Sequence, residues 1–218
     1  MTHERRLSPP SWSSWLLLCA LLIAIQPAEL EAQRRNRDSW QRVPDVMAAL
    51  AIGEGSRVAD VGAGSGYFTE YLSTEVGAGG RVYAVDISER SLSQLRRLAQ
   101  EDGLANIEVV RGEVDDPRLP ERSLDAVLVV DAYHEMTEYE AMLSGMYKAL
   151  KPGGRLVILD HVPSDPSQSR DRQTRSHELS IDIVEQEVIA AGFEILDRDE
   201  QFTESGRNHG QWLLVARR

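Results

Sequence analysis

The stretch Val58-Ala-Asp-Val-Gly-Ala-Gly-Ser-Gly-Tyr-Phe-Thr69 decides the fold class of this chain. It begins as a short apolar run, which is typical of a buried strand, and continues into a predicted helix. Between the two lie three glycines at alternate positions, Gly62, Gly64 and Gly66. Because glycine has no side chain, such a turn lets a ligand lie against the backbone at the carboxyl end of the strand.

An acidic residue closes the next apolar run. Asp86 ends the predicted strand 81–86, 20 residues after Gly66. This position suits a carboxylate that accepts hydrogen bonds from ribose hydroxyls, so the sequence predicts an adenosine-type cofactor. The glycine spacing is GxGxG, whereas the dinucleotide fingerprint GxGxxG would place its third glycine at Tyr67. The spacing therefore disfavours a nicotinamide cofactor.

Predicted strands and helices alternate along most of the chain. We expect strands over 57–61, 81–86, 107–111, 124–130, 155–160, 193–201 and 211–216, and helices over 43–50, 67–76, 89–102, 137–150 and 182–191. Thr137 and Glu140 predict a capping box. The polar segment 161–180 is long for a loop in a compact domain, so we expect it to be functional or mobile. This order predicts a single α/β domain with a doubly wound, Rossmann-like sheet.

Composition and charge exclude several classes of partner and site. The chain has 218 residues, enough for one domain with a substantial core, and a formal net charge of −11. That charge argues against a nucleic-acid partner, which would require a basic surface. The single cysteine, Cys19, excludes an intramolecular disulfide and a cysteine metal site.

The N-terminal region has the pattern of an export signal. Arg5 and Arg6 precede the apolar run 15–25, and small residues up to Ala32 follow before a polar segment. The run is about half of the roughly 20 residues that a membrane-spanning helix needs. We therefore expect a cleaved signal peptide and no spanning helix in the mature chain.

The predicted organisation is a signal peptide at 1–32, an Arg-rich segment at 33–42 and the domain at 43–218. The mature protein would then be periplasmic or secreted. Four alternatives remain: a twin-arginine signal, lipid attachment at Cys19, an uncleaved anchor, or a start codon assigned too early. An uncleaved signal would leave the protein membrane-anchored, and a misassigned start would leave it cytoplasmic.

Five pieces of the chain together resemble the class I S-adenosylmethionine-dependent methyltransferases. They stand in the order of that family and comprise residues 58–68, 82–86, 112–114, 124–128 and 150–155. The resemblance extends over 43–216, and it is closest to small methyltransferases with Tyr-His-Glu after the fourth strand. It implies a seven-stranded sheet of order 3-2-1-4-5-7-6 with strand 7 antiparallel. It also implies S-adenosylmethionine as the cofactor.

The resemblance implies a cofactor site made of Asp60, Gly62, Ala63, Gly64, Gly66, Asp86, Ile87, Glu113, Val114 and Asp131. Asp60 and the glycine turn would hold the amino-acid end, together with N–H groups at the start of the helix. Asp86 would accept from the ribose hydroxyls. Glu113 would accept from the adenine amino group, with Asp115 and Asp116 as alternatives.

Residues at the carboxyl end of the fourth strand would face the methyl group in this fold. Tyr133 and His134 lie there, and His161 ends the fifth strand beside it. A histidine titrates near neutral pH, so His134 or His161 could act as a base or orient the acceptor. The alternative is that both histidines only cap or pack at strand ends. Two histidines without diagnostic spacing do not predict a metal site, and we expect none.

The expected function is methyl transfer from S-adenosylmethionine to a small-molecule acceptor. Two alternatives remain, because a fold and a cofactor motif do not establish turnover. One is a non-catalytic S-adenosylmethionine-binding sensor or scaffold. The other is a nicotinamide-dependent oxidoreductase.

Overall fold

The computed structural model describes residues 36–101, 104–203 and 210–218. The predicted signal peptide at 1–32 lies outside these ranges. The chain divides into two units, residues 1–39 and residues 40–218. In the first unit, residues 36–39 are helical, and the second unit contains all the strands that the structure describes.

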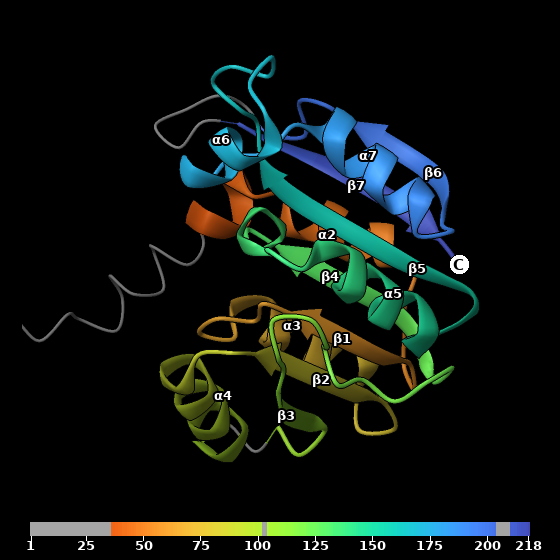
Figure 1. Ribbon diagram of the computed structural model, residues 1–218. Helices are drawn as coiled ribbons and strands as arrows, with labels where there is room; N and C mark the ends of the chain where they lie inside the picture. The colour runs from red at the N-terminus through yellow and green to blue at the C-terminus, as the bar shows by residue number, and fades with distance from the viewer. Residues whose placement is uncertain (1–35, 102–103, 204–209) are drawn as a thin grey trace, which may run out of the picture. The chain divides into compact units, whose positions relative to one another are not determined.

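One seven-stranded sheet forms the middle layer of the second unit (Figure 1). Its order is β3-β2-β1-β4-β5-β7-β6. The strands are β1 (Arg57–Val61), β2 (Arg81–Asp86), β3 (Ile107–Arg111), β4 (Leu124–Val130), β5 (Leu150–His161), β6 (Glu194–Asp199) and β7 (Gln211–Arg217). β1 to β5 pair in parallel, and β7 runs antiparallel to both β5 and β6. The predicted α/β fold and strand order are confirmed.

Helices cover both faces of the sheet. One face packs against α2 (Val43–Leu50), α3 (Tyr67–Val76) and α4 (Glu89–Glu101), and the other against α5 (Tyr139–Ala149) and α7 (Ile181–Ala190). Strand β4 shows why both faces must be covered. Its Ala126 and Leu128 belong to the first core, whereas Val127 and Val129 belong to the second. Successive strand side chains point to opposite faces, so the apolar run 126–130 of this strand needs cover on each.

The predicted starts of α5 and β5 were wrong. Helix α5 begins at Tyr139, and its N-cap, Glu138, makes no side-chain capping bond, so the capping box does not form. The reason is that residues 133–135 form a 3₁₀ helix and Met136 leaves it in an extended conformation. Strand β5 begins at Leu150 rather than at 155, because its first residues still pair with β4 across an irregularity in the register.

The segment 161–180 is folded rather than open. It contains the short helix α6 (Arg170–Arg175). The side-chain N–H of Gln173 donates to the backbone carbonyl of Gln168 at 2.8 Å. The side-chain oxygen of Gln173 accepts from Ser180 N–H at 2.7 Å. Leu179 is buried in the core, and its carbonyl accepts from the Trp212 indole. Among the helices in the described ranges, none has the length and apolar character needed to span a bilayer.

Candidate functional site

A cavity of about 470 Å³ lies at the carboxyl ends of β1, β2 and β4. Its size is within the range of about 300–1,000 Å³ that small-molecule sites occupy. The cavity is lined by seven of the ten cofactor residues expected from the sequence: Gly62, Gly64, Asp86, Ile87, Glu113, Val114 and Asp131. The structure therefore brings together residues from four separate parts of the sequence.

The glycine turn forms one wall of this cavity. Gly62 has a φ of +79°, and a Cβ added there would lie 2.4 Å from the Ala132 Cβ. Gly64 has a φ of +56°, and a Cβ added there would meet no atom within 4 Å. Gly62 is thus required by a close approach of two chain segments, whereas Gly64 leaves open space at the cavity wall.

The Asp86 carboxylate is held in place by two backbone donors. One oxygen accepts from Gly64 N–H at 2.9 Å, and the other accepts from Ser88 N–H at 2.8 Å. A carboxylate has about four acceptor positions, so capacity remains for ribose hydroxyls. The carboxylate is therefore oriented in advance, and the same contact links the glycine turn to the end of β2.

Two exposed apolar side chains line the next part of the cavity. Ile87 is 55% exposed and Val114 is 56% exposed. Apolar lining with a few fixed polar groups is typical of small-molecule sites. The Glu113 carboxylate lies beside them and forms an ion pair with Arg118 at 2.9 Å. The predicted adenine acceptor is therefore already engaged by a neighbouring cation.

Three of the predicted cofactor residues do not line the cavity. Asp60 is buried, and its carboxylate accepts from the Thr69 hydroxyl at 2.6 Å, which links β1 to α3. Ala63 N–H donates to the Val85 carbonyl at 3.0 Å. Gly66 precedes α3, and a Cβ added there would lie 2.6 Å from a methyl group of Leu98. These residues position the turn.

The buried carboxylate of Asp160 organises the polar side of the site. It accepts from the backbone N–H of His134 at 3.0 Å and from that of His161 at 2.8 Å. One of its oxygens also lies 2.7 Å from Nδ1 of the His134 ring. Burial alone would lower the pKa of His134, but the hydrogen bond and negative charge of Asp160 outweigh it, and the pKa is raised.

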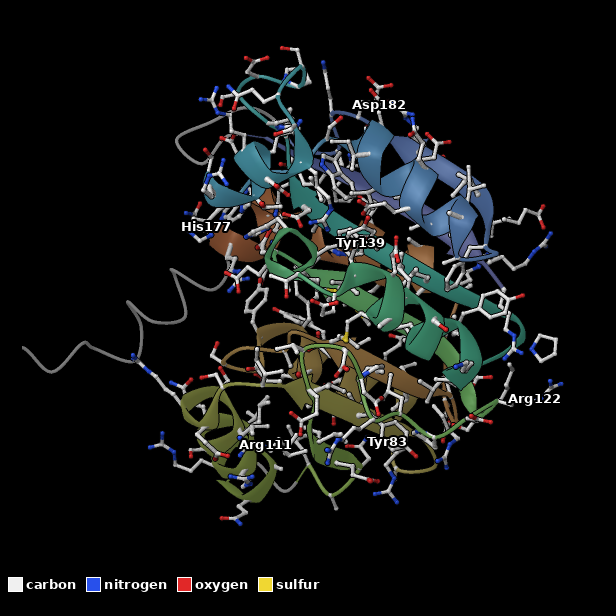
Figure 2. The ribbon with its side chains drawn as sticks, in the orientation of Figure 1. Tyr83, Arg111, Arg122, Tyr139, His177 and Asp182 are labelled. Atoms are coloured by element: carbon white, nitrogen blue, oxygen red, sulfur yellow. The ribbon has the colours of Figure 1, made fainter. Side chains whose placement is uncertain are left out.

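Tyr133 points away from the cavity. It is fully buried, and its hydroxyl donates to the Glu187 carboxylate of α7 at 2.8 Å. Burial, followed by the charge of Glu187, raises the pKa of the phenol. Arg170 of α6 donates to the other Glu187 oxygen at 2.7 Å and stacks over the Tyr139 ring, which Figure 2 labels on α5. The structure thus makes Tyr133 part of a packing network rather than of the cavity wall.

This network predicts a stability effect. Glu187→Gln keeps an acceptor for Tyr133 but removes the charge that pairs with Arg170, so we expect the free energy of unfolding to fall by about 1–2 kcal/mol. Denaturant unfolding followed by circular dichroism measures it. Glu194→Gln is the matched control, because Glu194 forms an exposed ion pair with Arg217. Equal losses in the two variants would contradict the network's role.

Asp131 gathers two glutamines that the sequence alone did not single out. Its carboxylate accepts from the Gln41 amide at 3.3 Å and from the Gln211 amide. The Nε2 atom of His161 lies 3.4 Å from the same carboxylate. Both glutamines are fully buried. A buried polar side chain has no periodic signature, so only the fold reveals this cluster.

Comparison with known proteins agrees with this geometry. Residues 58–154 match the model of a family described as a methyltransferase domain. The demethylmenaquinone methyltransferase of Listeria welshimeri is 30% identical over 121 residues, which cover 56% of this chain and 50% of the relative. The ubiquinone/menaquinone biosynthesis C-methyltransferase of Escherichia fergusonii is 33% identical over 122 residues, 56% of this chain and 48% of the relative. The chain thus spans about half the length of these curated relatives.

A solved structure extends the likeness to nearly the whole chain. The structure of an S-adenosylmethionine-dependent methyltransferase from Aquifex aeolicus superposes with a TM-score of 0.71 at 23% identity, covering 88% of this chain and 98% of that one. At this identity the likeness establishes the fold, and the family match covers the strands around the cavity. Residues 58–154 thus resemble a methyltransferase domain, and the second unit has the fold of a solved S-adenosylmethionine-dependent methyltransferase.

Proposed function

We propose that the chain binds S-adenosylmethionine in this cavity and transfers its methyl group to a small-molecule acceptor. One observation carries the proposal. The cavity joins a side-chain-free glycine wall, the preoriented carboxylate of Asp86 and the exposed apolar pair Ile87 and Val114. These are the surfaces that a methionyl chain, a ribose and an adenine each require.

The chain's own groups fit the three parts of the cofactor. Asp86 would accept from the ribose hydroxyls, while Ile87 and Val114 would cover the adenine. The N–H groups of Gly62 and Ala63 already donate to the Val85 carbonyl. The amino-acid carboxylate would therefore be met by N–H groups in the first turn of α3, whose N-cap provides no side-chain acceptor.

The protein's part in the reaction is to align the reactants and to exclude water. When bound, the cofactor supplies a methyl group that its sulfonium has already activated. Asp131 and Glu135 line the cavity next to His134, and we assign this polar side to the acceptor. Asp160 holds Nδ1 of the His134 ring, so Nε2 is the ring nitrogen that faces the Glu135 side.

Binding and transfer are measured separately. Calorimetry of the full chain should show binding of S-adenosylmethionine and not of NAD. Labelled cofactor with a host extract should then give a labelled small molecule, and demethylated quinones, named for the curated relatives, belong among the purified acceptors. Binding of NAD alone would contradict the proposal. Tight S-adenosylmethionine binding without transfer to any acceptor would favour a non-catalytic sensor or scaffold instead.

We also propose export of the mature protein, which rests on the sequence of residues 1–32. Cleavage after Ala32 would give the native protein an N-terminus at Gln33. N-terminal sequencing of protein isolated from the native cell tests this, and an N-terminus at Met1 would contradict it.

A further inference from the structure

Three side chains that can bind a metal meet beside the cavity. Nε2 of His134 and Nδ1 of His177 each lie 3.8 Å from the same carboxylate oxygen of Glu135. One ligand atom from each of the three side chains lies within 4.8 Å of the other two. His177 is 43 residues beyond His134 in the sequence, and Figure 2 shows it beside α6, near the carboxyl ends of the strands.

Two imidazoles and one carboxylate form a donor set suited to Zn²⁺ and related divalent transition metals. Tetrahedral bonds of about 2.1 Å place ligand atoms roughly 3.4 Å apart, so the two separations of 3.8 Å must close by about 0.4 Å. Glu135 and His177 can make that movement, because their side chains are 66% and 73% exposed. His134 is the fixed ligand, because its side chain is only 4% exposed.

The surroundings of His134 are those of a metal ligand. Metal-bound histidines almost always donate their other ring N–H to a carboxylate or carbonyl, which fixes the ring orientation. Asp160 is in this position, 2.7 Å from Nδ1, and it is fully buried. The ring therefore directs Nε2 toward Glu135 and the cavity side, where an ion would bind.

We propose that His134, Glu135 and His177 bind one divalent transition-metal ion, with Asp160 as the positioning residue behind His134. Three protein ligands leave a coordination position open, as in catalytic zinc sites. An oxygen of the methyl acceptor could fill that position, and the ion would favour its deprotonated form. This last role rests on the proposed function, whereas the metal site does not. The proposal departs from the expectation of no metal site, which considered only the two histidines His134 and His161.

The test is a titration of the full chain, stripped with a chelator, with Zn²⁺ alone and with Co²⁺ alone. Calorimetry should show one tight site per chain. The absorption spectrum of bound Co²⁺ should be that of an ion with few ligands. Asp160→Asn should weaken Zn²⁺ binding about 10–100-fold, the range found for outer-shell partners of a metal ligand. Loss of a direct ligand in His177→Ala or Glu135→Gln should weaken it at least as much. Circular dichroism checks that each variant is folded. Glu135→Gln and His177→Ala alter exposed side chains, so they provide the test even if Asp160→Asn does not fold.

His161→Gln is the matched control. The rings of His134 and His161 are 6.2 Å apart, but His161 is directed toward Asp131 and lies outside the proposed ligand set. Zn²⁺ affinity should be unchanged in this variant. Equal affinity in the unchanged chain and in His177→Ala would overturn the site, as would loss of binding in His161→Gln alone. S-adenosylmethionine binding by the unchanged chain is measured separately, in the presence of chelator. A chain that binds the cofactor but no metal would therefore contradict the metal site and not the proposed methyltransferase function.

Discussion

We expect Asp86→Ala to weaken S-adenosylmethionine binding by about 1.5–3 kcal/mol, roughly ten- to hundredfold in Kd. The substitution removes the acceptors proposed for the ribose hydroxyls. It also releases the N–H groups of Gly64 and Ser88, both of which the carboxylate holds. The turn against which the ligand would lie thus loses one of its links to β2, while the bonds from Gly62 and Ala63 to Val85 remain. Calorimetry with S-adenosylmethionine measures the change.

Two companion variants separate these contributions. Asp86→Asn keeps one acceptor oxygen and the shape of the side chain, so its loss of affinity should be smaller. Glu108→Gln removes a carboxylate from neighbouring β3 that is half-exposed and 4.0 Å from Arg81. Its Kd should match that of the unchanged chain. An Asp86→Ala protein that is folded and binds with unchanged affinity would refute the assigned role.

Gly62→Ala should lower the free energy of unfolding by about 3 kcal/mol. The backbone there has a φ of +79°, which costs an alanine roughly 1–2 kcal/mol. The added methyl group would also lie 2.4 Å from the Ala132 Cβ, and such overpacking typically costs about 1–3 kcal/mol. Denaturant unfolding followed by circular dichroism gives the value.

Gly64→Ala is the matched control for the clash. Its φ of +56° carries the same kind of backbone penalty, but a Cβ there meets open space, so we expect a loss of only about 1–2 kcal/mol. Combining Gly62→Ala with Ala132→Gly should recover part of the loss, because the clashing methyl group is gone. Equal destabilisation by the two single alanine variants, with no recovery in the double variant, would show that close packing at Gly62 does not matter.

Local pattern was enough to predict the α/β class, whereas the strand order came from the family resemblance. The apolar run 126–130 of β4 required cover on both faces, and Asp86 ends β2 as the pattern predicted. The start of α5 was predicted wrongly, since a capping signal at Thr137 is outweighed by the 3₁₀ helix that precedes it. Tertiary context decides such boundaries.

The contacts on the polar side of the site could not be predicted from the sequence. Tyr133 and His134 are adjacent in the sequence, but only the 3₁₀ helix shows that the tyrosine hydroxyl reaches α7 while the histidine ring meets Asp160. His177 carries no local signal, because its neighbours in space come from residues more than 40 positions earlier. Contacts of this range depend on the folding of the intervening chain.

The two hydrogen bonds that hold the Asp131 carboxylate have a consequence for the order in which the site forms during synthesis. Its two amide donors, Gln41 and Gln211, are 170 residues apart and come from opposite ends of the second unit. A nascent chain would possess Gly62, Asp86 and Asp131 long before β7 is synthesised. The Asp131 side of the cavity could not be completed until β7 had joined the sheet. The acceptor side of the proposed site would therefore be completed late in biosynthesis, after β7 is in place.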